Sequence, residues 1–218
     1  MFMVKYLLME LEYVKKTYEE IANRFSATRS GYYWTEISNF LKLLPKHSIV
    51  LDAGCGNGRY IDFSAKAKLN LEILGFDFCE ASGKICSERG FDIQIANTKK
   101  IPYRNNCCDA SISVAVIHHL ESIESRLGAC MELKRVTKPN GLIFIQVWAA
   151  DVPKNKKFIK INDNNDYYVT WYINKTKKVK RYYHLFEMNE CKELVEQSGI
   201  IVKDILYDHD NWVIIGYA

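Results

Sequence analysis

The chain has 218 residues, of which 48% are hydrophobic and 26% charged, and its net charge of +4 is small, as in an ordinary globular protein with one well-buried domain. Its seven cysteines are odd in number, irregularly spaced and without a C-x-x-C pair, which argues against a disulfide framework or a structural zinc site. Reduced thiols predict a cytoplasmic or nuclear protein with no metal of its own. The stretch Met1–Glu10 is too short and too charged for a signal peptide or membrane span, so no membrane partner is expected.

The N-terminal part of the chain predicts two helices ahead of the first strand. Apolar residues recur at helical spacing between Leu11 and Phe25, and a second helix is expected from about Trp34 to Leu44, ending before Pro45. We expect residues 1–45 to form a helical cap.

Strands and helices then alternate along the chain. The expected strands are Ile49–Ala53, Leu71–Asp77, Phe91–Ala96, Asp109–Val116, Leu142–Trp148, Ile201–Tyr207 and Trp212–Tyr217. The expected helices lie at about 58–68, 80–89, 121–136 and 189–198. This alternation predicts an α/β fold: a single domain over residues 1–218 with a doubly wound, mostly parallel, Rossmann-like seven-stranded sheet that ends in an antiparallel hairpin.

The basic excess of the chain is confined to one segment. Between Asp151 and Arg181, nine basic residues outnumber three acidic ones, a local net charge of +6 that leaves −2 for the rest of the chain. Aromatic residues are frequent in the same region. We expect residues 150–188 to form a basic substrate-binding insertion, in which lysines follow phosphates and aromatics stack on unpaired bases of an RNA loop. A solvated charge run is the alternative for this segment taken alone.

The most specific motif is Asp52-Ala53-Gly54-Cys55-Gly56-Asn57-Gly58, between the first expected strand and the following helix. A dinucleotide fingerprint, G-x-G-x-x-G, places its third glycine one residue later. Asp52 would repel a pyrophosphate but attract the ammonium and sulfonium of S-adenosylmethionine (SAM). We therefore expect Asp52, Gly54, Gly56 and Gly58 to bind SAM, and a dinucleotide oxidoreductase is the least favoured alternative.

Three later residues are candidates for the same cofactor site. Asp77 ends the second strand, where a carboxylate can accept hydrogen bonds from both ribose hydroxyls of an adenosine; a solvated acid is the alternative. Asn97 ends the third strand and could accept the adenine amino group, or could cap a turn. Val116 follows the fourth strand and could pack on the cofactor or belong to the core.

The glycine motif resembles motif I of class I SAM-dependent methyltransferases, and four longer stretches resemble one family within them. These stretches are Tyr18–Arg29, Ser113–Leu120, Val147–Ala149 and Lys180–Phe186. They are similar to the eukaryotic tRNA wobble-uridine carboxymethyl methyltransferases. The resemblance covers nearly the whole chain and is weakest between about 150 and 178.

The resemblance implies a substrate, a partner and a set of site residues. The substrate would be the carboxylate of 5-carboxymethyluridine in a tRNA anticodon loop, esterified at the wobble position. A small zinc-binding activator protein would cover the edge strand Phe91–Ala96. The residues placed beside the cofactor as catalytic are Arg29, His118, Trp148, Arg181 and His184.

The chemistry of a carboxylate acceptor suits these residue types. A free carboxylate, with a pKa near ~4, is ionised at neutral pH and needs no strong base. A guanidinium can orient it through a bidentate fork, which makes Arg29 and Arg181 the candidates. The histidines, His119 included, could hydrogen-bond the carboxylate or the uracil, and Trp148 could stack on the base or form a wall of the site.

Other interpretations remain open from the sequence. A small-molecule methyltransferase acting on a quinone or a carboxylate would have an apolar pocket and no salt-sensitive tRNA binding. A non-catalytic SAM-binding scaffold is opposed by the intact glycine motif and by Asp77. Taken alone, Arg29 could be a surface arginine, Arg181 could belong to the basic run, and Trp148 could be core.

Overall fold

The computed structural model describes residues 9–29, 31, 33–152 and 154–218, so residues 1–8 of the expected cap lie outside the described residues. The described helices are α2 (Lys16–Ala27), which follows a π-helical turn at Leu11–Lys15, α3 (Thr35–Leu43), α4 (Arg59–Lys66), α5 (Glu80–Glu88), α6 (Ile123–Val136) and α7 (Met188–Gln197), with a 3-10 turn at Ile117–His119. The strands are β1 (Ile49–Ala53), β2 (Glu72–Asp77), β3 (Ile93–Ile95), β4 (Cys108–Val114), β5 (Thr137–Trp148), β6 (Phe158–Lys160), β7 (Asp166–Tyr172), β8 (Lys178–His184), β9 (Ile201–Asp208) and β10 (Asn211–Tyr217).

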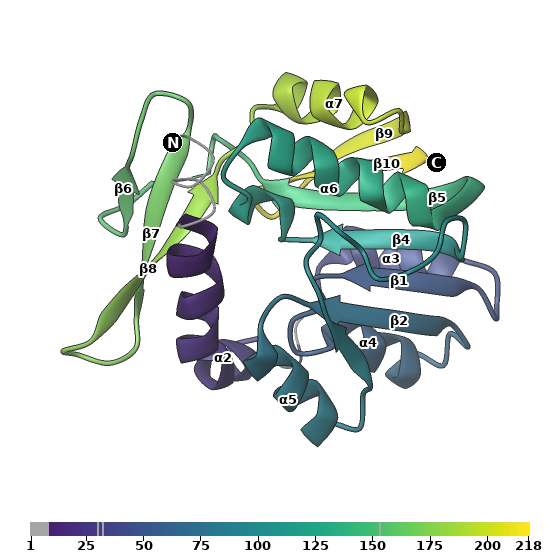
Figure 1. The fold of residues 1–218 in the computed structure, drawn as a ribbon, viewed down its shortest axis with the longest axis horizontal. Coiled ribbons are helices and arrows are strands. Elements are labelled where there is room, and N and C mark those ends of the chain that lie inside the picture. Colours follow the sequence, from purple (N-terminus) through teal and green to yellow (C-terminus); the bar gives the residue numbers. More distant parts are fainter. Residues whose placement is uncertain (1–8, 30, 32, 153) are drawn as a thin grey trace.

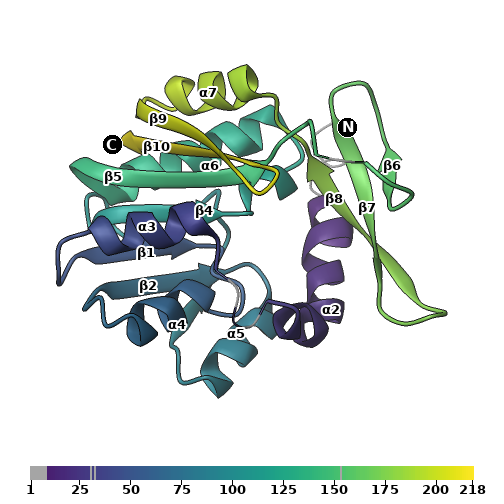
Figure 2. The ribbon, with the colours of Figure 1, turned by 180° about the vertical axis from the view of Figure 1, so that it is seen from behind.

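Seven strands form the main sheet, in the order β3-β2-β1-β4-β5-β10-β9. Strand β1 pairs in parallel with β2 and β4, whereas β10 pairs antiparallel with β5 and β9. Helices α6 and α7 cover one face, and α3 and α4 cover the other (Figures 1 and 2). The predicted doubly wound sheet with a terminal antiparallel hairpin is confirmed.

Strand β1 shows why these residues form a sheet between two helical layers. Val50 packs into the core beneath α3 and α4, and the next residue, Leu51, packs into the core beneath α6 and α7. Successive side chains of a strand point to opposite faces, so a strand covered on both faces is apolar throughout. This burial fixes the carboxyl end of β1, where the glycine motif begins.

The edges of the main sheet follow the prediction in position but not in length. Strand β3 is the edge strand beside β2, as expected, but it spans only Ile93–Ile95. Strand β5 begins at Thr137, five residues earlier than expected.

No helix in the described part of the chain is long and apolar enough to cross a membrane.

The basic segment forms a second, three-stranded antiparallel sheet, β6-β7-β8, which the sequence did not predict. Its inner face packs Tyr167, Val169, Tyr183 and Leu185 against one another and against Trp148. Most aromatic residues of the segment are therefore core or half-buried, and Tyr172 alone among the seven from Phe158 to Tyr183 is exposed. The expected row of aromatics available to stack on bases is thus reduced to this one side chain.

Helix α2 lies between the two sheets (Figures 1 and 2). On one side, the Glu19 carboxylate accepts hydrogen bonds from the backbone N–H groups of Glu80, at 2.6 Å, and Ala81, at 2.8 Å, at the start of α5. On the other side, the Thr17 hydroxyl donates to the Lys180 carbonyl of β8 at 3.1 Å. The helix is thus attached both to the main sheet layer and to the small sheet.

Replacing Glu19 by Ala should lower the free energy of unfolding by about 1 kcal/mol, because the N-terminus of α5 loses a charged acceptor. Glu12→Ala is the control, since it removes an exposed pair with Lys16 and should cost less than about 0.5 kcal/mol. Urea denaturation of the two variants measures both values. Equal losses would contradict a specific capping role for Glu19.

Candidate active site

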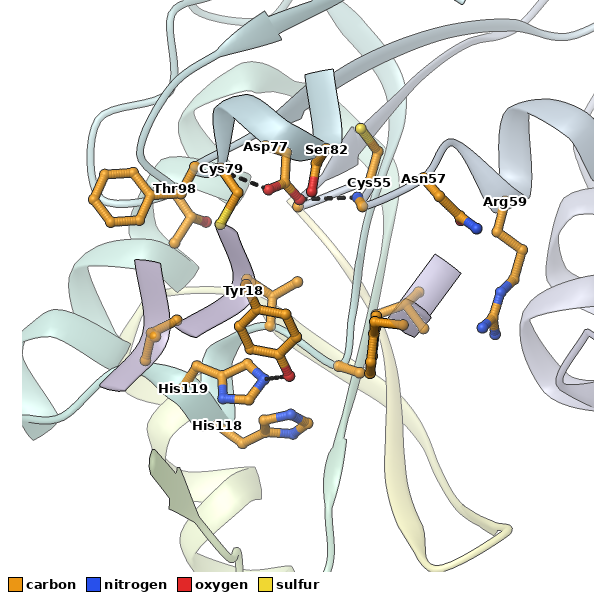
Figure 3. Close-up of a pocket in the computed structure, with 18 of the residues that line it drawn as sticks. Tyr18, Cys55, Asn57, Arg59, Asp77, Cys79, Ser82, Thr98, His118 and His119 are labelled. Carbon is orange, nitrogen blue, oxygen red and sulfur yellow. Dashed lines mark hydrogen bonds between the residues drawn. The ribbon is translucent and has the colours of Figure 1, made fainter. Parts of the chain in front are cut away.

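A cavity of about 360 Å³ lies at the carboxyl ends of β1, β2 and β4, beside α2 (Figure 3). Its lining comes from the glycine loop after β1, from the residues that follow β2, β3 and β4, and from α2 and β8. Ligands of open parallel sheets bind at this end, where the loops after several strands converge. The position and size therefore suit a cofactor together with the reacting part of a substrate.

Two glycines of the loop are required because a side chain at either position would clash with a different neighbour. Gly54 has a φ of +85°, and a Cβ there would lie 2.4 Å from Cγ2 of Val116. Gly58 has a φ of +72°, and a Cβ there would lie 2.7 Å from the ring of Phe91. Gly54, Gly56 and Val116 line the cavity, whereas Gly58 caps α4 and is not among the described lining residues. Gly58 therefore supports the conformation of the loop without lining the cavity.

Asp77 is fixed in the cavity wall by the glycine loop. Its Oδ2 accepts the Gly56 N–H and its Oδ1 accepts the Cys79 N–H, both at 2.9 Å (Figure 3). Burial raises the pKa of the Asp77 carboxyl, and these hydrogen bonds oppose the shift. The remaining lone pairs leave room for the expected hydrogen bonds from ribose hydroxyls, which stay a prediction.

Asp52 is a buried carboxyl with an unsatisfied oxygen. It is 1% exposed, and its Oδ2 has no hydrogen-bond partner among the described residues. Burial raises the pKa of Asp52 to about 7; Asp77 adds to the shift and Arg59 opposes it. A cationic ligand would compensate the ionised carboxylate. The loop therefore fits a ligand that carries an ammonium and a sulfonium.

The two residues that follow the β3 edge contribute differently. Asn97 lines the cavity, but its Oδ1 already accepts the Lys99 N–H at 2.9 Å, so it caps a turn. Thr98 is buried in the same wall, and its Oγ1 has no hydrogen-bond partner in the described part of the chain. Nothing in the sequence singles out Thr98. Its hydroxyl is an additional candidate contact for a polar ligand.

His118 and His119 are neutral, and their tautomers are fixed. Burial lowers the pKa of His118 well below its ordinary value and that of His119 to about 3. His119 Nδ1 must donate to the Tyr182 carbonyl, at 2.8 Å, so Nε2 accepts the Tyr18 hydroxyl at 3.0 Å (Figure 3). His118 Nδ1 accepts the Trp148 N–H at 3.1 Å, so its proton is on Nε2. Both histidines act as hydrogen-bonding groups without charge.

Three arginines approach the cavity without a carboxylate partner. None of the salt bridges between described residues includes Arg29, Arg59 or Arg181. Arg29 and Arg59 line the cavity, and burial together with Arg59 lowers the pKa of Arg29. Arg181 is buried behind the lining, where its Nη1 donates to the Tyr183 hydroxyl at 2.8 Å. Cations at a cavity without a carboxylate partner favour an anionic substrate.

Trp148 lines the cavity as expected, whereas His184 does not. Trp148 stacks on Tyr183, with ring centroids 4.5 Å apart and planes at 20°. His184 lies outside the described lining, and its ring nitrogens bond Asp166 at 2.8 Å and Glu190 at 2.7 Å. Both nitrogens are therefore occupied, and the geometry favours a positioning role for His184 over contact with substrate. The described residues contain no group of three or more His, Cys, Asp or Glu side chains placed to hold a metal.

Sequence reasoning gave no role inside the cavity to two tyrosines of its lining, Tyr18 and Tyr183. Tyr18 fits the apolar face of a helix, so its hydroxyl carried no signal. Tyr183 follows Arg181 by two residues, and residues two apart in a strand share a face. That signal was available, but only once the segment had been recognised as a strand.

Asp52→Asn should stabilise the unliganded protein more at pH 8 than at pH 5. The folded-state pKa of about 7 is above the unfolded value of 3.8, so stability is lost as pH rises through this range. The penalty that Asn removes is of the order of 4 kcal/mol at most. Urea denaturation measures it, and calorimetry should show weaker SAM binding by the same variant.

Asp109→Asn is the control, because its effect on stability should change with pH in the opposite direction. The hydrogen bond from Lys138 holds the pKa of Asp109 below its usual value, so the wild-type carboxylate contributes stability that is present at neutral pH and lost on acidification. This variant should therefore lose stability relative to wild type as pH rises. A pH-independent effect of Asp52→Asn would contradict the assignment of a buried, uncompensated carboxyl.

Comparison with known proteins agrees with this geometry. The family model described as a methyltransferase domain matches residues 51–145. The crystal structure of PH0226 protein from Pyrococcus horikoshii OT3 has the same fold, with a TM-score of 0.73 at 14% identity over 92% of this chain and 95% of that one. A methyltransferase in complex with the Haloferax volcanii Trm112 activator has a TM-score of 0.71 at 13% identity, over 94% and 97%.

Curated relatives are more similar in sequence. The tRNA (carboxymethyluridine(34)-5-O)-methyltransferase of Schizosaccharomyces pombe is 34% identical over 94% of this chain and 96% of its own length. The ALKBH8 enzyme of Macaca fascicularis is 42% identical over 72% of this chain, which spans only 23% of that longer protein. An Arabidopsis thaliana relative is 41% identical over 66% of this chain and 34% of its length. The chain therefore belongs to the family of tRNA (carboxymethyluridine(34)-5-O)-methyltransferases.

Proposed function

We propose that this chain uses SAM to esterify the carboxylate of 5-carboxymethyluridine at the wobble position of a tRNA. The observation that carries the proposal is that one cavity brings together carboxylates and a guanidinium. Asp52, Asp77 and Arg29 all line it, and Arg181 lies behind the lining at Tyr183. Membership of the family and its named relatives support the same reaction.

The cofactor end is built from the glycine loop and the strand ends. When bound, SAM supplies an electrophilic methyl group on its sulfonium. Asp77 would accept the ribose hydroxyls, and Asp52 would face the cationic part of the cofactor. Gly54 and Gly56 allow the backbone to approach closely, and Val116 with Asn97 would complete the pocket.

The substrate end orients a carboxylate and need not remove a proton. Arg29 would hold the carboxylate, and the Nε2–H of neutral His118 is an additional donor at the cavity. Trp148 would form the wall against the base. Positioning of this kind can supply on the order of 7–11 kcal/mol of the barrier reduction. The low pKa values of both histidines suit this role, because no general base is required.

Residues 150–188 would bind the anticodon loop, and residues 1–45 would close the cavity as a cap. The lysines of the small sheet, Lys156, Lys157, Lys175, Lys178 and Lys180, are exposed, as phosphate binding requires. All seven cysteines are free thiols, which supports a reducing compartment such as the cytosol or nucleus.

The deciding experiment incubates the purified chain with labelled SAM and tRNA that lacks the final methyl group, with and without a candidate activator protein. We expect a base-labile methyl ester on the tRNA, formed less efficiently as salt rises. Arg29→Lys should lower kcat/KM about 10- to 100-fold with SAM binding unchanged, because the planar guanidinium that orients the carboxylate is lost. Arg24→Lys, in helix α2 and outside the described lining of the cavity, is the control.

Two results would overturn the proposal. One is no transfer to tRNA under any of these conditions. The other is transfer only to a small quinone or free carboxylate, with no salt-sensitive binding of tRNA. Loss of SAM binding by Arg29→Lys would instead assign Arg29 to the cofactor.

We also propose that an activator protein docks along the β3 edge, with any zinc held in that partner. Among the described strands, β3 pairs with β2 alone, and Ile95 is 47% exposed there. An open edge with little charge invites a partner, and the Haloferax volcanii protein of the same fold forms a complex with an activator. Ile95→Lys should abolish co-purification with the activator. Ile201→Lys, 66% exposed on the opposite edge strand β9, should not; equal effects would contradict the docking site.

A further inference from the structure

Two phenols separate the buried Arg181 from the cavity. Tyr18 of α2 and Tyr183 of β8 line the cavity, and their hydroxyl oxygens lie 3.2 Å apart. Arg181 Nη1 donates to the Tyr183 hydroxyl at 2.8 Å and approaches the Tyr18 hydroxyl at 3.4 Å. The guanidinium therefore acts on the cavity through these hydroxyl groups.

The surroundings of Arg181 leave its charge poorly compensated. The residue is 4% exposed, its Nε has no hydrogen-bond partner among the described residues, and no carboxylate forms a salt bridge with it there. Its guanidinium carbon lies 5.1 Å from the ring centroid of Trp171 and 5.2 Å from that of Tyr183. Aromatic rings compensate a buried cation only in part. An anion that enters the cavity would supply the missing counter-charge.

The direction of the hydrogen bonds is fixed by His119. Its Nδ1 donates to the Tyr182 carbonyl, so its Nε2 takes the only hydroxyl hydrogen of Tyr18. The Tyr18 oxygen can then only accept, and the Tyr183 oxygen accepts from Arg181. The acceptor within reach of the Tyr183 hydrogen is the neutral oxygen of Tyr18, which accepts a hydrogen bond more weakly than an anion does. The Tyr183 hydrogen is therefore available to an anion in the cavity.

We propose that Tyr183 is a catalytic residue that donates its hydroxyl hydrogen to the substrate carboxylate, with Arg181 acting through it and with Tyr18 and His119 as positioning residues. This inference rests on the proposed function. Tyr183 keeps its proton throughout, and its ring is held by stacking on Trp148.

A polarised neutral phenol has an advantage over a direct ion pair at this position. An arginine in bidentate contact with each carboxylate oxygen would stabilise the charged ground state, which does not accelerate the reaction. One hydrogen bond from Tyr183 orients one oxygen and leaves the other free to act as nucleophile. The buried cation strengthens this hydrogen bond without touching the carboxylate.

The test compares wild type, Tyr183→Phe, Arg181→Met and the double variant in methyl transfer to tRNA lacking the final methyl group. Tyr183→Phe should lower kcat about 10- to 100-fold, with KM for tRNA and the Kd for SAM within threefold of wild type. The double variant should be no slower than the slower single variant, because Arg181 acts through the lost hydroxyl. Tyr33→Phe removes a hydroxyl that donates to Asp62 outside the described lining and should leave kcat unchanged.

The outcomes separate the two proposals. Transfer by Tyr183→Phe at the wild-type rate, or losses that multiply in the double variant, would overturn this inference and leave the proposed function standing. Absence of transfer by wild type would overturn the proposed function itself. If Tyr183→Phe does not fold, a wild-type crystal with S-adenosylhomocysteine and 5-carboxymethyluridine decides. A carboxylate oxygen about 3 Å from the Tyr183 hydroxyl supports the inference, and direct contact with Arg181 instead overturns it.

Discussion

The buried guanidinium of Arg181 is the constraint on which the substrate half of this molecule depends. It lies on the inner face of the small sheet, and it needs partners from three elements to remain buried. Tyr18 and Phe25 approach it from α2, Trp171 from β7 and Tyr183 from its own strand. The N-terminal helix and the small sheet are thereby held together around a charge that neither could cover alone. Their joint surface forms one wall of the cavity.

The charged groups at the cavity come from different parts of the fold. The main sheet supplies Asp52 and Asp77 at its strand ends, whereas Arg29 comes from the N-terminal segment and Arg181 from the small sheet. Asp52 carries an unsatisfied buried oxygen, and Arg181 carries an unsatisfied buried nitrogen. Burying each of these groups is costly, and a ligand of opposite charge would compensate each of them. The protein thus maintains strain at the two places where a cationic donor and an anionic acceptor would bind.

The main sheet and the cofactor loop could be predicted from the sequence because their signals are local. The run of apolar strands and the spacing from Asp52 to Gly58 are visible within a few residues. The role of Gly58 was not predictable in detail, because the ring that excludes a Cβ there belongs to Phe91, more than thirty residues away. The small sheet was not predicted because the many lysines of the segment suggested a solvated run. The alternation of buried Tyr167 and Val169 along β7 was therefore not recognised as a strand. The contacts of His184 depend on Asp166 and Glu190, which only the folded chain brings together.

Helix α2 also joins the two halves of the cavity mechanically. Near its carboxyl end, Ser26 accepts a hydrogen bond from Asn57 of the glycine loop at 2.9 Å, and Glu20 pairs with Lys177 of the small sheet. A movement of this helix that opens one half must therefore open the other. The binding of a methyl donor at the glycine loop and of a nucleic acid at the small sheet would then be mechanically coupled through one helix.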